Sequence, residues 1–293
     1  MGRAKRIPYG VSDFIDIIER NQYYVDKTMY IPKLEDEPDA LFFIRPRRFG
    51  KSLFISMLRA YYDIKRKDKF DKLFGNLWIG SHPTENQGKY QVLFLDFSKI
   101  GGSIDQLEEN FNAYCNECID SFIETYQEYY PERVVESVLT AKTAARKLNA
   151  IGIAAEKKNL PLYLIVDEYD NFTNVVLNEQ GEEVYTALTH ASGFYREIFK
   201  VFKGMFSKIF MTGVSPVTLD DLTSGFNIGW HISTKPAFNQ MLGFSTEDVR
   251  DLFTYYKENG EIRPDSDVEA IIEEMKPWYD NYCFSKSALK TQS

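Results

Sequence analysis

The chain has 293 residues, of which 35 are basic and 43 acidic, so its formal net charge is −8 at pH 7. That balance argues against a protein that coats nucleic acid or an anionic membrane with its whole surface. A hydrophobic content of 44% excludes a disordered chain, and no apolar run approaches the roughly 18 residues of a membrane span. We expect a soluble, cytoplasmic protein without membrane contact, whose three cysteines are ordinary reduced thiols.

Short apolar runs alternate with longer amphipathic segments through most of the chain. The runs predict buried strands at 41–44, 92–95, 162–166 and 208–211, with a fifth near 227–232. The segments between them predict helices at 51–63, 105–126, 132–158 and 184–202. Apolar strands that alternate with helices indicate a mainly parallel sheet covered on both faces. The predicted fold class is therefore a three-layer α/β/α sandwich.

The pattern changes near the C-terminus, where only helices are predicted, at 249–256 and 267–275. We therefore expect a core at 1–233 followed by a small helical lid at 234–293. The polar last residues suggest that this lid is cut short.

The loop after the first predicted strand, residues 45–52, reads Arg-Pro-Arg-Arg-Phe-Gly-Lys-Ser. It matches a Walker A loop, whose backbone amides and following helix N-terminus surround phosphates. Lys51 would reach the β- and γ-phosphates, and Ser52 would ligate Mg²⁺. Arg45 departs from the pattern, because a glycine usually stands there. A basic surface turn is the alternative, but four cations crowded into one loop of an acidic chain favour a polyanion pocket.

The third predicted strand ends in Asp167 and Glu168, which matches a Walker B element. Asp167 would hold Mg²⁺, and Glu168 would orient and deprotonate the attacking water. An acidic turn after a buried strand is the structural alternative. Asp170 lies close by, and either a role near the metal or structural capping fits it.

A further predicted strand, 92–95, separates the two motifs, and a glutamate follows the Walker B aspartate. Both features favour the additional-strand ATPases over the kinase and GTPase division of P-loop proteins. Such ATPases place a polar residue that senses the γ-phosphate at the end of another strand. Thr212 and Ser215 are both candidates, and a hydroxyl that merely caps the strand end is the alternative.

With these motifs in place, the chain resembles the bacterial AAA-ATPase-like family, whose members often carry a C-terminal PD-(D/E)XK nuclease-like domain. The matching stretches are YVDKT at 24–28, FIRPRRFGKS at 43–52, VDEYD at 166–170, TGVSP at 212–216, MLGFSTE at 241–247 and WYDNY at 278–282. In this family an arginine at the first loop position is normal. We find no nuclease trio in the sequence and expect that domain to be absent here.

The resemblance also implies where the nucleotide lies. The N-terminal segment, 1–40, is expected near the base. The residues assigned to nucleotide binding are Tyr24, Asp26, Arg47, Phe49, Gly50, Lys51, Ser52, Leu53 and Thr212. Arg48, with Arg47 as the alternative, is assigned as a catalytic charge beside the γ-phosphate, together with Lys51 and Glu168.

The leading functional hypothesis is an ATPase that uses Mg²⁺ and couples hydrolysis of the β–γ bond to motion between core and lid. A slow nucleotide switch or binding module with negligible turnover is the second, and a small-molecule kinase is the third. ATP is the expected ligand. A protein partner or self-association remains open, and DNA enters only by analogy with the family.

Overall fold

The computed structural model describes residues 4–102, 104–171, 194–215, 229–279 and 284. Its centre is a sheet of five strands in the order β2-β3-β4-β1-β5, with every neighbouring pair parallel. The strands span β1 Ala40–Ile44, β2 Gln91–Asp96, β3 Leu162–Asp167, β4 Lys208–Gly213 and β5 Trp230–His231. All five predicted strands are present. Strand β4 lies between β1 and β3, so the Walker A and Walker B strands are not adjacent, as in additional-strand ATPases.

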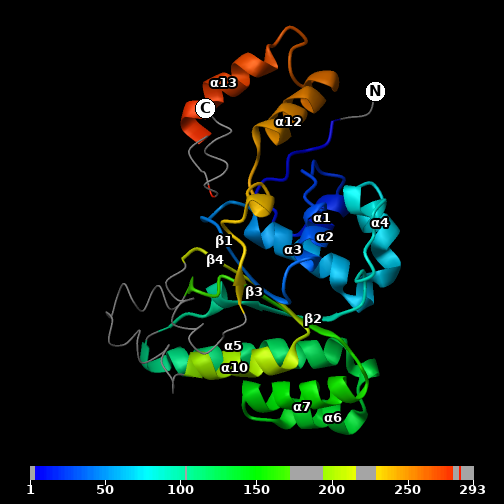
Figure 1. Cartoon of the computed structure of the whole chain (residues 1–293), viewed down its shortest axis with the longest axis vertical. Helices are drawn as coiled ribbons and strands as arrows, with labels where there is room; N and C mark the ends of the chain where they lie inside the picture. Colours follow the sequence, from blue (N-terminus) through cyan, green and yellow to red (C-terminus); the bar gives the residue numbers. More distant parts are fainter. Residues whose placement is uncertain (1–3, 103, 172–193, 216–228, 280–283, 285–293) are drawn as a thin grey trace.

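Helices cover both faces of this sheet, which confirms the three-layer α/β/α architecture (Figure 1). One layer contains α5 Ile104–Thr125, α6 Glu132–Thr140, α7 Ala144–Lys157 and α10 Phe194–Met205. The other contains α1 Phe14–Glu19, α2 Tyr30–Glu35, α3 Lys51–Tyr62 and α4 Phe70–Phe74. Short 3-10 helices connect several elements: η1 Ile64–Lys69, η2 Trp78–Gly80, η3 Phe97–Lys99, η4 Gln127–Tyr129 and η5 Pro236–Phe238.

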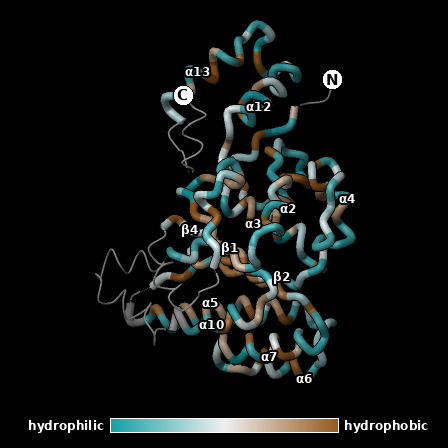
Figure 2. The backbone as a smooth tube through the Cα atoms, in the orientation of Figure 1, coloured by the Kyte–Doolittle hydropathy of each residue, from teal (hydrophilic) through white to brown (hydrophobic). Residues whose placement is uncertain are grey.

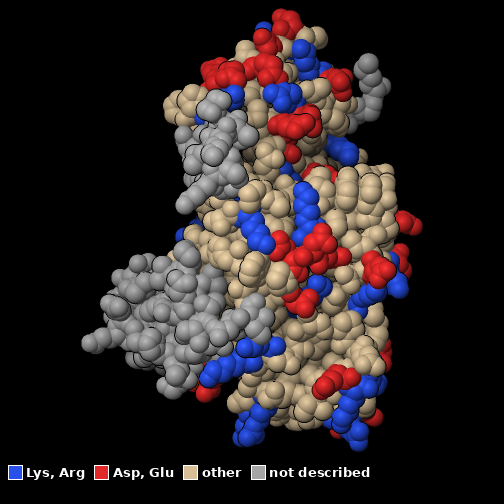
Figure 3. Space-filling model, viewed as in Figure 1, with Lys and Arg blue, Asp and Glu red and all other residues tan. Residues whose placement is uncertain are grey.

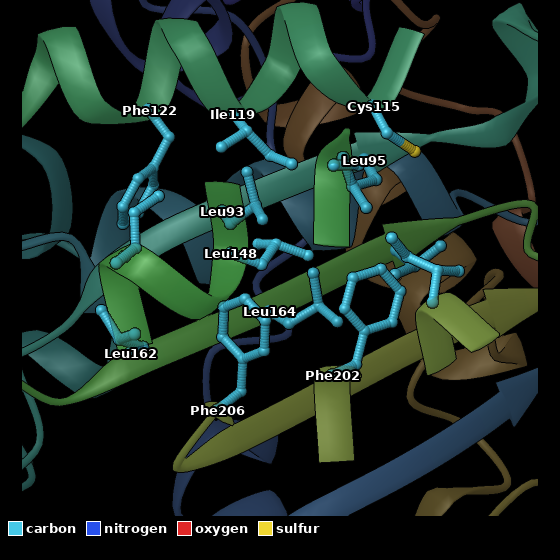
Figure 4. Packing of buried hydrophobic residues seen from close by; sticks show 14 of the residues in the cluster. Leu93, Leu95, Cys115, Ile119, Phe122, Leu148, Leu162, Leu164, Phe202 and Phe206 are labelled. Carbon is cyan, nitrogen blue, oxygen red and sulfur yellow. The ribbon is translucent and has the colours of Figure 1, made fainter. Parts of the chain in front are cut away.

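The alternation of side chains along each strand divides the core into two clusters. In β1, Phe42 packs with the α5 layer, whereas Phe43 packs with the α3 layer. Every residue of the central strand β3 is buried, which explains its continuous apolar sequence. Edge strand β2 alternates between buried and half-buried positions. Figure 2 shows hydrophobic stretches along the sheet between the helical layers, and Figure 4 shows side chains of α5 meeting those of β2 and β3.

The prediction of one continuous helix at 132–158 is wrong. The segment at 132–158 forms two helices, α6 and α7, instead of one. The break comes at Thr143, whose backbone is extended and whose hydroxyl accepts a hydrogen bond from the amide of Arg146 at 3.4 Å. A threonine N-cap of this kind starts a new helix. Of the segment predicted at 184–202, only the part in α10 lies within the described residues.

Two further helices, α12 Thr246–Glu258 and α13 Val268–Tyr279, lie beyond the sheet at the top of Figure 1, and we call them the distal helix pair. Ser245 and Asp248 form a capping box at the start of α12. Lys27 of the N-terminal segment makes an ion pair with Asp248 at 2.7 Å. Acidic and basic side chains are interspersed over the visible face of this pair in Figure 3. The division between core and lid at 233 remains a prediction.

Within the described residues, none of the helices is long and apolar enough to cross a bilayer.

Replacing Thr143 with alanine tests the helix break. Loss of the N-cap bond should lower the free energy of unfolding by about 1 kcal/mol. Thr140→Ala is the matched control, because the Thr140 hydroxyl donates to the carbonyl of Glu136 within α6 and caps nothing. Urea denaturation of both variants measures the difference. Equal stability of the two variants would contradict a capping role for Thr143.

Candidate functional site

The carboxyl ends of β1, β3 and β4 meet at one edge of the sheet, because the three strands are parallel and neighbours. Ile44 pairs with Gly213, and Val166 pairs with Met211. This register brings the loop 45–50 close to the residues that end β3 and β4. Ligands of open α/β sheets bind at such an edge.

The backbone of the loop curls into the start of α3. Gly50 is the N-cap of α3 and has a φ of 89°, a left-handed conformation that glycine adopts without strain. A Cβ at Gly50 would meet no atom within 4 Å, so the backbone angle and not the space requires the glycine. Gly50 offers no side chain to cap the first amides of α3. Those amides are therefore suited to bind an anion.

Lys51 lies at the centre of the site and is only 5% exposed. Its ammonium donates hydrogen bonds to the carbonyl oxygens of Arg45 at 2.9 Å and Pro46 at 3.1 Å. Burial lowers the pKa of Lys51, and the nearby carboxylates of Asp167 and Glu168 oppose that shift. The ammonium is thus held by two neutral carbonyls that a phosphate could replace.

Asp167, at the end of β3, connects the start of α3 with the end of β4. Its Oδ2 accepts a hydrogen bond from the hydroxyl of Ser52 at 2.6 Å. Its Oδ1 accepts from the hydroxyl of Thr212 at 2.6 Å and from the amide of Glu168 at 3.0 Å. Asp167 is buried, whereas Ser52 is exposed to solvent. The structure therefore brings together both predicted metal ligands and the predicted γ-phosphate sensor.

These oxygens fit a magnesium ion. Mg²⁺ is typically held by one or two protein oxygens and completes its shell with water and substrate phosphate. The adjacent carboxylate of Asp167 and hydroxyl of Ser52 supply that kind of donor set. Among the described residues, no group of three or more histidine, cysteine, aspartate or glutamate side chains could hold a metal alone. A cation at this edge would therefore depend on substrate and water for its other ligands.

Glu168 follows Asp167 in a strained backbone conformation with a φ of 50°. Burial raises the pKa of the Glu168 carboxyl, and the neighbouring charge of Asp167 raises it further, while Lys51 and Arg47 oppose the shift. Backbone strain and a raised carboxyl pKa both cluster at functional sites. The arrangement suits a carboxylate that accepts a proton.

Arg45 does not lie with the other cations of the loop, which corrects our grouping of all four; the polyanion pocket itself remains a prediction. Arg45 is 1% exposed, and its guanidinium donates to the carbonyls of Ser233 and Phe238 at 2.8 and 3.1 Å. Burial lowers the pKa of Arg45 to about 10. Arg47 and Arg48, in contrast, are exposed. Arg45 is therefore occupied inside the protein, and three cations of the loop remain for a bound anion.

Asp170 has a structural role that sequence reasoning left open. Its carboxylate accepts hydrogen bonds from the amides of Val214 and Ser215, and so fixes the chain that leaves β4. A Cβ at Gly213 would lie 2.6 Å from Oδ1 of Asp170, which explains the glycine. Of the two sensor candidates, Thr212 contacts Asp167, whereas the backbone of Ser215 contacts Asp170.

The residues expected near the base make mainly structural contacts. Asp26 accepts hydrogen bonds from the amide and hydroxyl of Thr28 and from the amide of Trp78. The ring of Tyr24 packs edge-on against Phe14 at 5.2 Å. Their role in binding the base remains a prediction.

Phe49 and Leu53 flank the glycine and lysine of the loop, and both are half-buried. The carbonyl of Phe49 accepts a hydrogen bond from the amide of Gly243 at 3.0 Å. The sequence did not indicate this contact between the loop and the distal part of the chain.

The raised pKa of Glu168 predicts the pH dependence of one variant. A raised folded-state pKa means that the ionised carboxyl destabilises the fold, so stability is lost as pH rises through that value. Without nucleotide, Glu168→Gln should therefore melt above the wild type at pH 8, and the gap should close towards about pH 4. Thermal melts across this range measure it.

Glu128→Gln is the control, because the hydrogen bond from Lys65 lowers the pKa of Glu128. Its difference from the wild type should have the opposite sign. A pH-independent melting difference for Glu168→Gln would contradict the electrostatic assignment.

The chain is similar to several known proteins. The family model described as Predicted AAA-ATPase matches residues 8–223. An uncharacterized protein in the vnfD 5′ region of Azotobacter chroococcum mcd 1 is 25% identical over 303 residues, covering 97% of this chain and 50% of that protein. The chain thus spans half the length of this relative. The solved structure of the ORC2 protein of Aeropyrum pernix, in ADPNP–ADP complexes, is similar to this chain at 13% identity and a TM-score of 0.37. The match covers 88% of this chain and 57% of that one. This likeness is too remote to bear on function. The family match covers well over half of the chain, which therefore belongs to the Predicted AAA-ATPase family.

Proposed function

We propose that the chain binds ATP with Mg²⁺ at this sheet edge and hydrolyses its β–γ bond. The observation that carries the proposal is the 2.6 Å hydrogen bond between Ser52 and Asp167, which joins the phosphate-loop helix to the end of β3. It unites the two motifs that such chemistry requires across 115 residues of sequence. Family membership supports nucleotide binding in general, and the activity itself is our proposal.

The loop 45–50 and the start of α3 would bind the phosphates. The free amides at the start of α3 and the ammonium of Lys51 surround the phosphates, and the carbonyls of Arg45 and Pro46 release that ammonium when phosphate oxygens arrive. Arg47 and Arg48 are exposed on the same loop and add positive charge near the γ-phosphate.

Ser52 and Asp167 would hold the magnesium ion, which when bound neutralises charge on the β- and γ-phosphates. Thr212 keeps the Asp167 carboxylate in place through its 2.6 Å hydrogen bond. The same hydroxyl would sense the γ-phosphate.

Glu168 would orient the attacking water and accept its proton. A carboxylate whose pKa is raised by burial is a better base near neutral pH than an exposed one. The left-handed backbone at Glu168 fixes the direction in which the side chain leaves β3.

The strand order separates this proposal from the kinase alternative. In the kinase division the two Walker strands are neighbours, whereas here β4 lies between β1 and β3. A slow nucleotide switch uses the same site and differs only in turnover. The proposal also includes movement of a C-terminal lid, a protein or DNA partner, and self-association. It includes a cytoplasmic location as well, and the free thiols of Cys115 and Cys118 agree with a reducing compartment.

Replacing Lys51 with alanine should abolish nucleotide binding. The variant loses the buried ammonium that faces the phosphates, and we expect the Kd for Mg-ATP to rise at least about a hundredfold. Isothermal titration calorimetry measures it. Lys203→Ala, which removes an exposed lysine of α10, is the control and should bind as the wild type does. Unchanged binding by Lys51→Ala would refute the site.

Replacing Glu168 with glutamine should separate binding from hydrolysis. The amide keeps the shape of the side chain but cannot accept the proton, so phosphate release should fall about a hundredfold or more while ATP binding persists. Glu156→Gln, on the exposed face of α7, should leave both unchanged. If wild type and Glu168→Gln release phosphate equally slowly, the switch hypothesis replaces the ATPase.

A further inference from the structure

The segment 232–245 connects β5 to the distal helix pair, and we call it the connecting segment. The end of β1 and the loop 45–50, which we call the phosphate loop, hold it near its start. The hydroxyl of Ser233 accepts a hydrogen bond from the amide of Ile44 at 2.7 Å. The guanidinium of Arg45 donates to the carbonyl of Ser233 at 2.8 Å and to that of Phe238 at 3.1 Å. A buried guanidinium bound to two carbonyls fixes both in position.

The far end of the same loop holds the end of the connecting segment. The amide of Gly243 donates to the carbonyl of Phe49 at 3.0 Å. Gly243 has a φ of 80°, and a Cβ there would lie 3.2 Å from the ring of Phe49. The backbone angle favours glycine at this contact, and the ring of Phe49 would have to shift to admit a larger residue.

Phe284, which follows α13 in the chain, contacts both ends of the loop. Its ring lies 4.0 Å from the guanidinium carbon of Arg45 and meets the ring of Phe49 edge-on at 5.6 Å. The first and fifth residues of the loop thus touch residues on both sides of the distal helix pair.

The backbone of Arg45 connects this contact to the phosphate site. The carbonyl of Arg45 accepts a hydrogen bond from Lys51 at 2.9 Å, while its side chain binds the connecting segment. A phosphate that takes the Lys51 ammonium removes a charged donor from this carbonyl. A hydrogen bond to a charged group is stronger than a neutral one, so its loss would change the balance of contacts that hold the peptide after Arg45.

We propose that Arg45 is a positioning residue that transmits occupancy of the phosphate loop to the distal helix pair through the connecting segment. This inference rests on the proposed nucleotide binding. Arg45 stands where a Walker A loop has glycine, and it connects the phosphate loop to the distal helix pair. If Arg45 had a purely structural role, it would hold the connecting segment equally with and without nucleotide.

Hydrogen–deuterium exchange of α12 distinguishes these two cases. In the wild type, a non-hydrolysable ATP analogue with Mg²⁺ should change the exchange rates of α12 amides by about fivefold or more. Arg45→Gly restores the usual glycine. It should bind the analogue within about tenfold of the wild-type Kd, yet α12 should exchange equally with and without it. Arg45→Lys keeps the charge without the two-pronged geometry and should recover part of the response.

A full nucleotide response in Arg45→Gly would overturn the inference. The inference would also be overturned if the wild type bound the analogue without any change in the exchange of α12. If the wild type bound no nucleotide, the proposed function would be overturned as well. If Arg45→Gly does not fold, Gly243→Ala strains the backbone and crowds the ring of Phe49 at the other contact, and it should weaken the response. Gly260→Ala is its matched control, since Gly260 has a φ of 77° but no atom near its Cβ position. Equal responses in these two variants would also overturn the inference.

Discussion

The buried carboxylate of Asp167 is the constraint on which the site depends. A buried charge is tolerated only when donors satisfy it. Two of its donors, the hydroxyls of Ser52 and Thr212, come from α3 and β4, and the third is the amide of the next residue. Each bond to such a charged group contributes about 1.5–3 kcal/mol. The same bonds that satisfy Asp167 therefore align three separate chain segments.

The strand order makes this alignment available. Because β4 is inserted between β1 and β3, its last residues reach the gap between the two Walker strands. Gly213 and Asp170 then fit together so closely that no larger residue could replace the glycine without displacing the carboxylate. Thr212 is thereby fixed beside Asp167, so the position of the proposed γ-phosphate sensor follows from packing as well as from chain order.

The loop uses its cations for opposite purposes. Lys51 is buried but faces the site, and its carbonyl partners can be exchanged for phosphate. Arg45 is buried and faces the connecting segment, with ring contacts to Phe43 and Phe284. Arg47 and Arg48 are exposed. A loop of similar charges thus divides into one cation that we propose binds the ligand, one that binds the rest of the fold and two that are exposed.

The sequence by itself determined the strands, the parallel three-layer class and the two motifs, since each depends on local apolar runs and on charges at fixed spacing. It also assigned Ser52 and Asp167 to one magnesium ion, but it left Thr212 and Ser215 as two candidates for the γ-phosphate sensor. The break at Thr143 was missed, because alanine-rich segments on both sides look like one helix and a single cap decides the boundary.

Only the tertiary structure decided what Arg45 does. From the sequence it is one of four neighbouring cations, and nothing local separates an arginine that faces phosphate from one that faces inward. That choice depends on the carbonyls of Ser233 and Phe238, almost two hundred residues away. The role of Asp170 was undecided for the same reason, because its amide partners come from the end of another strand. Burial and long-range partners, which no local pattern encodes, assign these charges their roles.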